Sequence, residues 1–289
     1  MASQDHIRNP IEWGWGQISH VAVAVGSLPR SLLGSGEAKP APLPIHRIEV
    51  ADLGDVLRKG LDDFAAYRTD VIFLCLIYPL AGIALLWLTF GYDMLPLIFP
   101  LAAGFALIGP AAAVGLYEMS RRREQGRRIS WLDALGVLSS PRFGAILVLG
   151  LALLAVFALW LFVANVIYAA TLGPEAPASL AAFVRDTFTT PAGWAMIVVG
   201  TGAGFLFALL VLMISVVSFP LLLDRDVGLL TAVETSIQAV AENPRPMAAW
   251  GLIVAGSLLL GSIPAFLGLI VVMPVLGHAT WHLYRQVVK

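Results

Sequence analysis

Five long apolar regions, separated by shorter polar loops, dominate the chain after residue 70. A helix that spans a bilayer needs about 20 predominantly apolar residues, with a range of about 17–25. Four of the regions have this length and carry almost no charge: 71–90, 95–117, 143–170 and 192–223. The pattern predicts an all-α membrane protein in which these four segments cross the bilayer.

The fifth apolar region, 247–281, is too long for a single span. Gly261, Ser262 and Pro264 interrupt it near its middle. We expect a tight turn at these residues, because glycine and proline favour turns over continued helix. The two resulting spans would cover 247–262 and 264–284. The alternative is one long tilted helix with a kink at Pro264.

The distribution of Lys and Arg favours six spans over five. Basic residues gather in the cytoplasmic loops of membrane proteins. Six spans put 17 of the 18 Lys and Arg residues on one side and leave only Arg185 on the other, whereas five spans leave 15 on the first side. We therefore expect a multi-pass protein of the bacterial inner (plasma) membrane with both termini in the cytoplasm.

The first 50 residues differ from the rest of the chain. They contain scattered Gly, Ser and charged residues, with Pro40, Pro42 and Pro44 close together. This composition is typical of segments that do not build a packed core. We interpret 1–50 as a mostly flexible cytoplasmic tail and 51–289 as one polytopic membrane domain.

Each predicted hairpin is preceded by a short amphipathic segment that carries a helix-start signal. The three segments begin at Asp52, Ser130 and Thr231, and each has an acidic residue three positions later. A side-chain oxygen at the first position caps free amides, and an acid in the first turn complements the helix dipole. The sequence predicts three repeats, each an interfacial amphipathic helix followed by a helical hairpin.

Prolines mark the even-numbered spans. Pro100 and Pro110 in the second span have the same spacing as Pro264 and Pro274 in the sixth, and the fourth span has Pro220. A proline removes one amide donor and kinks a helix, and a membrane helix tolerates this only where protein surrounds the defect. We expect helix kinks at all five prolines, with Pro110 and Pro274 facing the bundle interior.

Several sequence blocks resemble a known family. They are FPLAAGFALIGP (99–110), GLYEMSRRREQG (115–126), DLGDVLRKGLDDF (52–64), SFPLLLDRDVGLLTAVETS (218–236) and ENPRPMAAWG (242–251). Over about residues 50–285 the chain resembles the bacterial predicted integral-membrane family called domain of unknown function 2189. The resemblance implies a multi-span membrane protein and supplies no activity.

Composition excludes several function classes. The chain is 58% hydrophobic and 13% charged, against roughly 25% charged in soluble domains. A net charge of −1 argues against a nucleic-acid partner, and the single cysteine, Cys75, permits neither an intrachain disulfide nor a cysteine metal site. The predicted spans also lack the ionisable residues that pumps and ion-coupled transporters place at membrane depth.

His278 and His282 are spaced so that both could face one ligand on a helix. A haem or metal site in a helical bundle needs further ligands from facing helices, and no other predicted span contains a histidine. We interpret both as interfacial histidines near Trp281 and Tyr284. We expect no cofactor, no metal and no enzymatic activity.

The most charged part of the chain follows the second span, and we call it the basic block: Glu118, Arg121, Arg122, Arg123, Arg127 and Arg128. One interpretation is an orientation signal alone. The other is contact with anionic lipid headgroups or with a partner subunit. Asp224, Arg225 and Asp226 form a smaller charged group, which we expect to pair with the basic block or to cap the third interfacial helix.

Two functions fit these observations. The first is a non-catalytic scaffold, assembly factor or accessory subunit of a larger inner-membrane complex. The alternative is a permease or channel for a small, weakly polar solute, without proton or ion coupling, that uses the proline-broken spans as gates. A polar cavity at the bilayer midplane would favour the permease, and a dry bundle with an exposed apolar groove would favour the scaffold.

Overall fold

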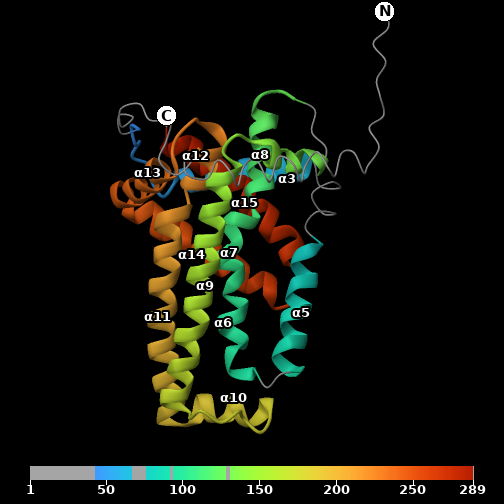
Figure 1. Ribbon diagram of the computed structural model, residues 1–289, viewed down its shortest axis with the longest axis vertical. Helices are drawn as coiled ribbons and strands as arrows, with labels where there is room; N and C mark the ends of the chain where they lie inside the picture. Colours follow the sequence, from blue (N-terminus) through green and yellow to red (C-terminus); the bar gives the residue numbers. More distant parts are fainter. Residues whose placement is uncertain (1–42, 67–75, 92–93, 128–130, 289) are drawn as a thin grey trace, which may run out of the picture.

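The computed structural model describes residues 43–66, 76–91, 94–127 and 131–288. Helices joined by short connections make up this part of the chain, which contains no strand beyond a single antiparallel bridge between Ile45 and Val288. Figure 1 shows a bundle of long helices with shorter helices lying across its upper end. We call this upper part the end layer: α3, α12 and α13, with the adjoining ends of α8 and α15.

Four lines of helix form the bundle together with the last hairpin of the chain, which is described below. They are α5 (Ile77–Gly91); η1 (Leu95–Leu97) followed by α6 (Ile98–Ala102), α7 (Gly104–Ala112) and α8 (Val114–Glu124); α9 (Phe143–Thr171); and α11 (Pro191–Ser215) followed by α12 (Ser218–Asp224). Of the described residues, three stretches are long and apolar enough to cross a membrane: Leu95–Glu124, Phe143–Thr171 and Pro191–Asp224. The predicted all-α membrane fold is confirmed at this level.

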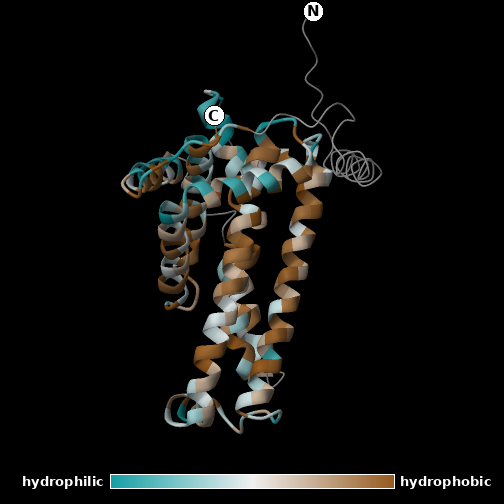
Figure 2. Ribbon diagram, turned by 90° about the vertical axis from the view of Figure 1, so that its left-hand side faces the viewer, coloured by the Kyte–Doolittle hydropathy of each residue, from teal (hydrophilic) through white to brown (hydrophobic). Residues whose placement is uncertain are grey.

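The outer surface of the bundle is apolar. Phe162 of α9 is 65% exposed, and Val198 of α11 is 67% exposed. Figure 2 shows the hydrophobic colour along the long helices and hydrophilic residues gathered at the ends. A contiguous apolar surface of this kind marks contact with a membrane rather than with water.

Trp160 fixes the contact between α9 and its neighbours. Its indole is 1% exposed, and its Nε1 donates to the carbonyl oxygen of Pro100 at 3.2 Å. On the facing helix, a Cβ on Gly204 would lie 3.2 Å from the Trp160 ring. The glycine therefore leaves room for the indole between α9 and α11, as expected where small residues let membrane helices approach.

Helices occur near all three predicted amphipathic starts, but their caps differ. The three helices are α3 (Asp52–Ala66), the 3₁₀ helix η2 (Trp131–Ser139) and α13 (Leu229–Glu242). Asp52 does act at its helix start, where its Oδ2 accepts from the Glu49 amide at 2.7 Å. The predicted cap at Thr231 is wrong, because Gly228 occupies the N-cap and Thr231 lies within the helix. Ser130 lies outside the described residues.

The fifth apolar region is broken into α14 (Pro244–Ser262) and α15 (Leu269–Val287), so a single kinked helix is wrong. The chain turns at 263–268, where Ala265 and Phe266 have φ of 50° and 64°. A Cβ on Gly268 would lie 2.7 Å from Cα of Gly261, so glycine is required for the two helix ends to meet. In Figure 1 this hairpin turns back well short of α10, and neither helix is among the three candidate spans.

The five prolines differ in their effect on the helices. The second line is interrupted at Ala103 and Ala113, three residues after Pro100 and Pro110. The α11–α12 line is interrupted at 216–217, three to four residues before Pro220, where a proline ring clashes with the preceding turn.

The remaining two prolines lie in the last hairpin. Pro264 lies within the turn at 263–268, whereas α15 continues through Pro274 without interruption. Pro274 is buried and Pro110 is half-buried.

Two segments have more structure than the sequence predicts. The helix α10 (Leu180–Thr189) lies across the lower end of the bundle in Figure 1, and the side chain of its N-cap, Ser179, accepts from the Ala182 amide at 3.1 Å. Its Leu180, Val184 and Phe188 form an exposed apolar stripe.

The other segment comprises residues 43–50, which we predicted to be flexible. The His46 amide donates to the Val287 carbonyl at 2.8 Å, and the Ile48 amide donates to Asn243 Oδ1 at 2.8 Å. The Asn243 side chain also donates to the His46 carbonyl at 3.1 Å. A flexible tail is therefore wrong for this part, because backbone hydrogen bonds attach it to the end layer. The rest of the predicted tail, 1–42, lies outside the described residues.

Candidate functional site

A polar cluster joins α3, α8 and α15 within the end layer. We call it the Asp63 cluster: Asp63 of α3, Ser120 and Arg123 of α8, and His278 and His282 of α15. Asp63 continues the buried face of α3, which also carries Leu53, Val56 and Gly60 at helical spacing. The two histidines lie one turn apart and therefore face the same side, with His282 bonded to Asp63 and His278 bonded to Ser120.

The Asp63 carboxylate accepts three hydrogen bonds. Its Oδ2 accepts from Ser120 Oγ at 2.6 Å and from His282 Nε2 at 3.0 Å, and its Oδ1 accepts from Arg123 Nη1 at 2.6 Å. Ser120 Oγ also lies 2.8 Å from His278 Nδ1. Because the serine hydroxyl has one hydrogen and gives it to Asp63, His278 Nδ1 is the donor in this last bond.

The surroundings favour the ionised form of Asp63. Burial of the carboxyl opposes ionisation, but the hydrogen bonds from His282 and Ser120 and the nearby histidines outweigh it, so the pKa of Asp63 lies below its ordinary value of 3.8. The side chain of Asp63 is only 7% exposed. It is therefore a buried carboxylate held by donors from two other helices.

Serine, histidine and aspartate meet here without forming a catalytic triad. In a triad the histidine lies between the serine and the acid and accepts the serine proton. In the Asp63 cluster the serine lies between the histidine and the acid, so no base accepts its proton. Ser120 is 2% exposed and His278 is fully buried. The arrangement joins three helices through one buried carboxylate.

A polar crevice of about 500 Å³ opens beside the cluster. Lys59, Arg123 and Arg285 contribute positive charge to its walls. Arg123 is paired with Asp63, and Arg285 Nη2 is 3.0 Å from Glu124 Oε1, so most of this charge is neutralised within the chain. No group of His, Cys, Asp and Glu side chains in the described residues has the geometry to hold a metal ion.

Much of the basic block is engaged in ion pairs within the protein. Glu118 is 2% exposed and accepts from Arg121 Nε at 2.8 Å and from Arg122 Nε at 2.6 Å. Arg122 also pairs with Asp133 of η2. A headgroup or partner contact by Glu118 itself does not fit this burial, because its carboxylate is enclosed by its own arginines.

The remaining members of the basic block lie closer to the surface. Arg123 belongs to the Asp63 cluster, and its side chain is 36% exposed. Arg127 is exposed, and Arg128 lies outside the described residues. Contact of the block with lipid headgroups or a partner therefore remains a prediction, with Arg127 and Arg123 as its accessible described members.

The charged group after α12 binds the C-terminal helix instead of the basic block. Asp224 Oδ2 accepts from Tyr284 Oη at 2.7 Å and lies 3.4 Å from Arg285 Nη1. Burial lowers the pKa of Arg285, but Glu124 and Asp224 outweigh it and raise that pKa above its ordinary value. The predicted pairing of Asp224 with the basic block is wrong, and Asp226 pairs with Arg142.

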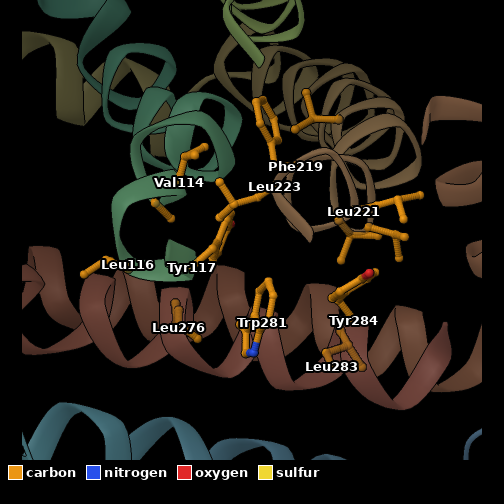
Figure 3. Packing of buried hydrophobic residues seen from close by; sticks show 14 of the residues in the cluster. Val114, Leu116, Tyr117, Phe219, Leu221, Leu223, Leu276, Trp281, Leu283 and Tyr284 are labelled. Atoms are coloured by element: carbon orange, nitrogen blue, oxygen red, sulfur yellow. The ribbon is translucent and has the colours of Figure 1, made fainter. Parts of the chain in front are cut away.

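Aromatic and aliphatic side chains surround these polar contacts. Figure 3 shows Trp281 and Tyr284 of α15 pointing toward Tyr117 of α8 and toward Phe219 and Leu221 of α12. All five side chains are 2% exposed or less. Tight apolar packing therefore lies directly beside the polar contacts of the end layer and shields the most buried of them, such as Ser120 to Asp63, from solvent.

The bundle contains a cavity of about 380 Å³, lined by α7, α11, α14 and α15 and by neighbouring residues of α8. We call it the apolar cavity. Its polar lining groups are few, chiefly Tyr117, Ser215 and Thr280, and none of the described residues that line it is charged. Pro110 and Gly109 lie in its wall. A pocket of this size is within the usual range of about 300–1,000 Å³ for ligand sites.

The histidine pair was visible in the sequence, but its partner was not. Asp63 is 219 residues from His282 along the chain. The available signal was its place on the apolar face of α3, at positions 53, 56, 60 and 63. A charged residue on such a face requires a buried partner.

Comparison with known proteins bears on this arrangement. A search of curated proteins and a search of solved structures found no match. The sequence model of a family described as predicted integral membrane protein (DUF2189) matches residues 98–224. This segment runs from α6 to α12 and includes Glu118 and Ser120. The wider resemblance over 50–285 remains a prediction, and over residues 98–224 the chain is similar to the DUF2189 family of predicted integral membrane proteins.

Proposed function

We propose that this chain is a non-catalytic integral membrane protein that acts as a scaffold, assembly factor or accessory subunit of a larger inner-membrane complex. The observation that carries the proposal is the lining of the apolar cavity, where no charged side chain occurs among the described residues. A solute path for ions or protons needs ionisable or polar groups at membrane depth. The charged side chains instead form ion pairs in the end layer, where they stiffen a rigid surface.

The proposal includes a membrane topology. The chain would cross the membrane six times, and α14 and α15 would be the two shortest crossings. The end layer would face the cytoplasm, so both termini would lie on the cytoplasmic side. Arg185 lies in α10, at the opposite end of the bundle from the end layer, which carries Arg123 and Arg285. The bridge between Ile45 and Val288 supports this topology, because it joins the two described ends of the chain.

Three repeated units and a headgroup contact complete this proposal. The helices α3, η2 and α13 precede successive hairpins, which supports a repeat of interfacial helix and hairpin. Arg127 is exposed near the end layer, where anionic headgroups of the inner leaflet would attract it.

A second function is a passive permease for a small, weakly polar solute. The observation that favours it is the position of Pro110, which lies in the wall of the apolar cavity within an interrupted line of helix. Interrupted helices form the moving parts of many transporters. The lining would then select a solute with little polarity.

Affinity purification of the full-length chain from native membranes in mild detergent tests the first proposal. We expect defined membrane proteins to co-purify in fixed ratio, and to do so equally well when Pro110 and Pro274 are both replaced by alanine. A chain that purifies alone, and whose reconstituted vesicles pass small apolar solutes until Pro110 and Pro274 are replaced, would support the permease instead.

A further inference from the structure

We propose that an anionic glycerophospholipid binds the apolar cavity, with one acyl chain between α11 and α14 and its phosphate at Arg245. The inference is independent of the scaffold proposal, because a bound lipid is compatible with either function. It rests on the opening of the cavity, on the small residues in its walls and on the charge at one end of it.

The apolar cavity opens sideways, toward the surroundings of the bundle. Leu252 of α14 is 75% exposed and Phe205 of α11 is 64% exposed, and both belong to its lining. These side chains therefore form the rim of a lateral opening between the two helices. The surface around the rim is apolar, so the medium outside the opening is the hydrocarbon of the bilayer.

Small residues make the furrow on the α14 side. Ala248, Gly251 and Ala255 follow one another at helical spacing and all line the cavity. A Cβ on Gly251 would lie 3.6 Å from Leu212 Cδ2, so only the tip of a side chain of α11 reaches α14 at this level. On α11, Ala208 adds to the space. The result is an apolar furrow between the two helices, with a volume of about 380 Å³ for an acyl chain to occupy.

Arg245 lies one turn before Ala248 on α14, on the same helical face. It is exposed and forms no ion pair with any residue that the structure describes. In contrast, Arg123 and Arg285 of the end layer are each paired with an acid. An unpaired guanidinium at the mouth of an apolar furrow, at the level of the end layer, matches the phosphate of a lipid whose chain fills the furrow.

Native mass spectrometry of the full-length chain in detergent tests the proposal. The chain is titrated with phosphatidylglycerol and, separately, with phosphatidylcholine that has the same acyl chains. We expect phosphatidylglycerol to bind about fivefold more tightly, as expected from one basic residue at an anionic headgroup. Arg245→Ala should lower the affinity for phosphatidylglycerol to that for phosphatidylcholine. Ala255→Phe should lower the binding of both lipids, because it fills the furrow.

Two matched variants serve as controls. Arg58→Ala removes an exposed arginine of α3, and Ala155→Phe adds the same ring to an exposed position of α9 outside the cavity. Both should bind lipid as the unmodified chain does. If Ala255→Phe fails to fold, as judged by thermal unfolding, Ala208→Phe fills the cavity from α11 and replaces it in the test.

Several outcomes would overturn the inference. One is unchanged phosphatidylglycerol binding in Arg245→Ala or in the cavity-filling variant. A second is displacement of the lipid by millimolar inorganic phosphate, which would leave a simple anion site. A third is a dimer of the chain that is lost in the cavity-filling variant, which would assign the furrow to a second copy.

Discussion

The hydroxyl oxygen of Ser120 lies 2.6 Å from Oδ2 of Asp63, although the two residues are 57 positions apart in the chain. Ser120 belongs to α8, the last part of an apolar line of helix, whereas α3 is amphipathic and lies across the bundle. Oδ2 of Asp63 also accepts a hydrogen bond from Nε2 of His282, in α15, at 3.0 Å. One carboxylate thus holds the amphipathic helix to two helices of the bundle, and its removal tests the role of the end layer.

Replacing Asp63 with alanine should destabilise the protein by about 3 kcal/mol, because it leaves Arg123, Ser120 and His282 without their shared acceptor. Unfolding in detergent micelles, followed by tryptophan fluorescence, measures the change. Asp55→Ala on the same helix is the control, since the Asp55 side chain is 63% exposed and pairs only with Arg58. Exposed pairs of this kind contribute about 0–1 kcal/mol. Equal effects of the two substitutions would contradict the clamp.

The stability of the protein should fall in acid through the titration of Asp63. Its pKa is lower in the folded protein than the ordinary value of 3.8, so the stabilisation is present above that value and is lost as the pH falls through the folded pKa. Unfolding curves recorded from about pH 6 to about pH 3 should therefore show a decline confined to the acidic end. Asp63→Asn should flatten this decline in stability. If the dependence of stability on pH is the same in Asp63→Asn, other carboxylates cause the decline.

Two glycines of α3 should respond oppositely to alanine. A Cβ on Gly60 would lie 2.7 Å from the Ala279 Cβ and 2.8 Å from the Ala279 amide nitrogen, so Gly60→Ala forces α3 away from α15. We expect a loss of about 1–3 kcal/mol. A Cβ on Gly54 would meet nothing within 4 Å, so Gly54→Ala should stabilise α3 by about 0.5–1 kcal/mol. Thermal unfolding of the two variants and of the unmodified chain measures both changes in stability. A loss of stability in both variants would contradict the close contact between α3 and α15.

Reporter fusions after residues 93, 180 and 289 test the proposed topology. We expect the first two fusions to be active outside the cytoplasm and the third to be active inside it. The turn at 263–268 supports the last of these, because it returns α15 to the end layer. A C-terminal reporter that is active only on the outer side would show that α14 and α15 make a single crossing together.

The long helices could be predicted because their signal is local. The helices α9 and α11 follow from uninterrupted apolar runs, and the turn at 263–268 follows from Gly261 and Pro264. Local signals do not fix every detail of a helix. Thr231 has the chemistry of a cap, yet α13 begins earlier, at Leu229. Pro274 does not interrupt α15.

The end layer was harder to predict, because its contacts join residues far apart in the chain. The Ile48 amide meets Asn243 across 195 positions, and Asp63 meets His282 across 219. No periodicity within either segment specifies such a partner. The helix α10 lies in the segment before α11, which the apolar pattern predicts to be a loop, although Ser179 and the apolar stripe of Leu180, Val184 and Phe188 carry a helical signal.

The hydrogen bond from the His46 amide to the Val287 carbonyl gives the chain an order of assembly during synthesis. Residues 43–48 leave the ribosome early, but their partners at Asn243, Val287 and Val288 are among the last residues translated. The N-terminal segment therefore waits, unpaired, while every long helix enters the membrane. Premature termination just before residue 287 would leave all of those helices in place and remove the partners of Ile45 and of the His46 amide, so that only the contacts with Asn243 would hold the N-terminal segment.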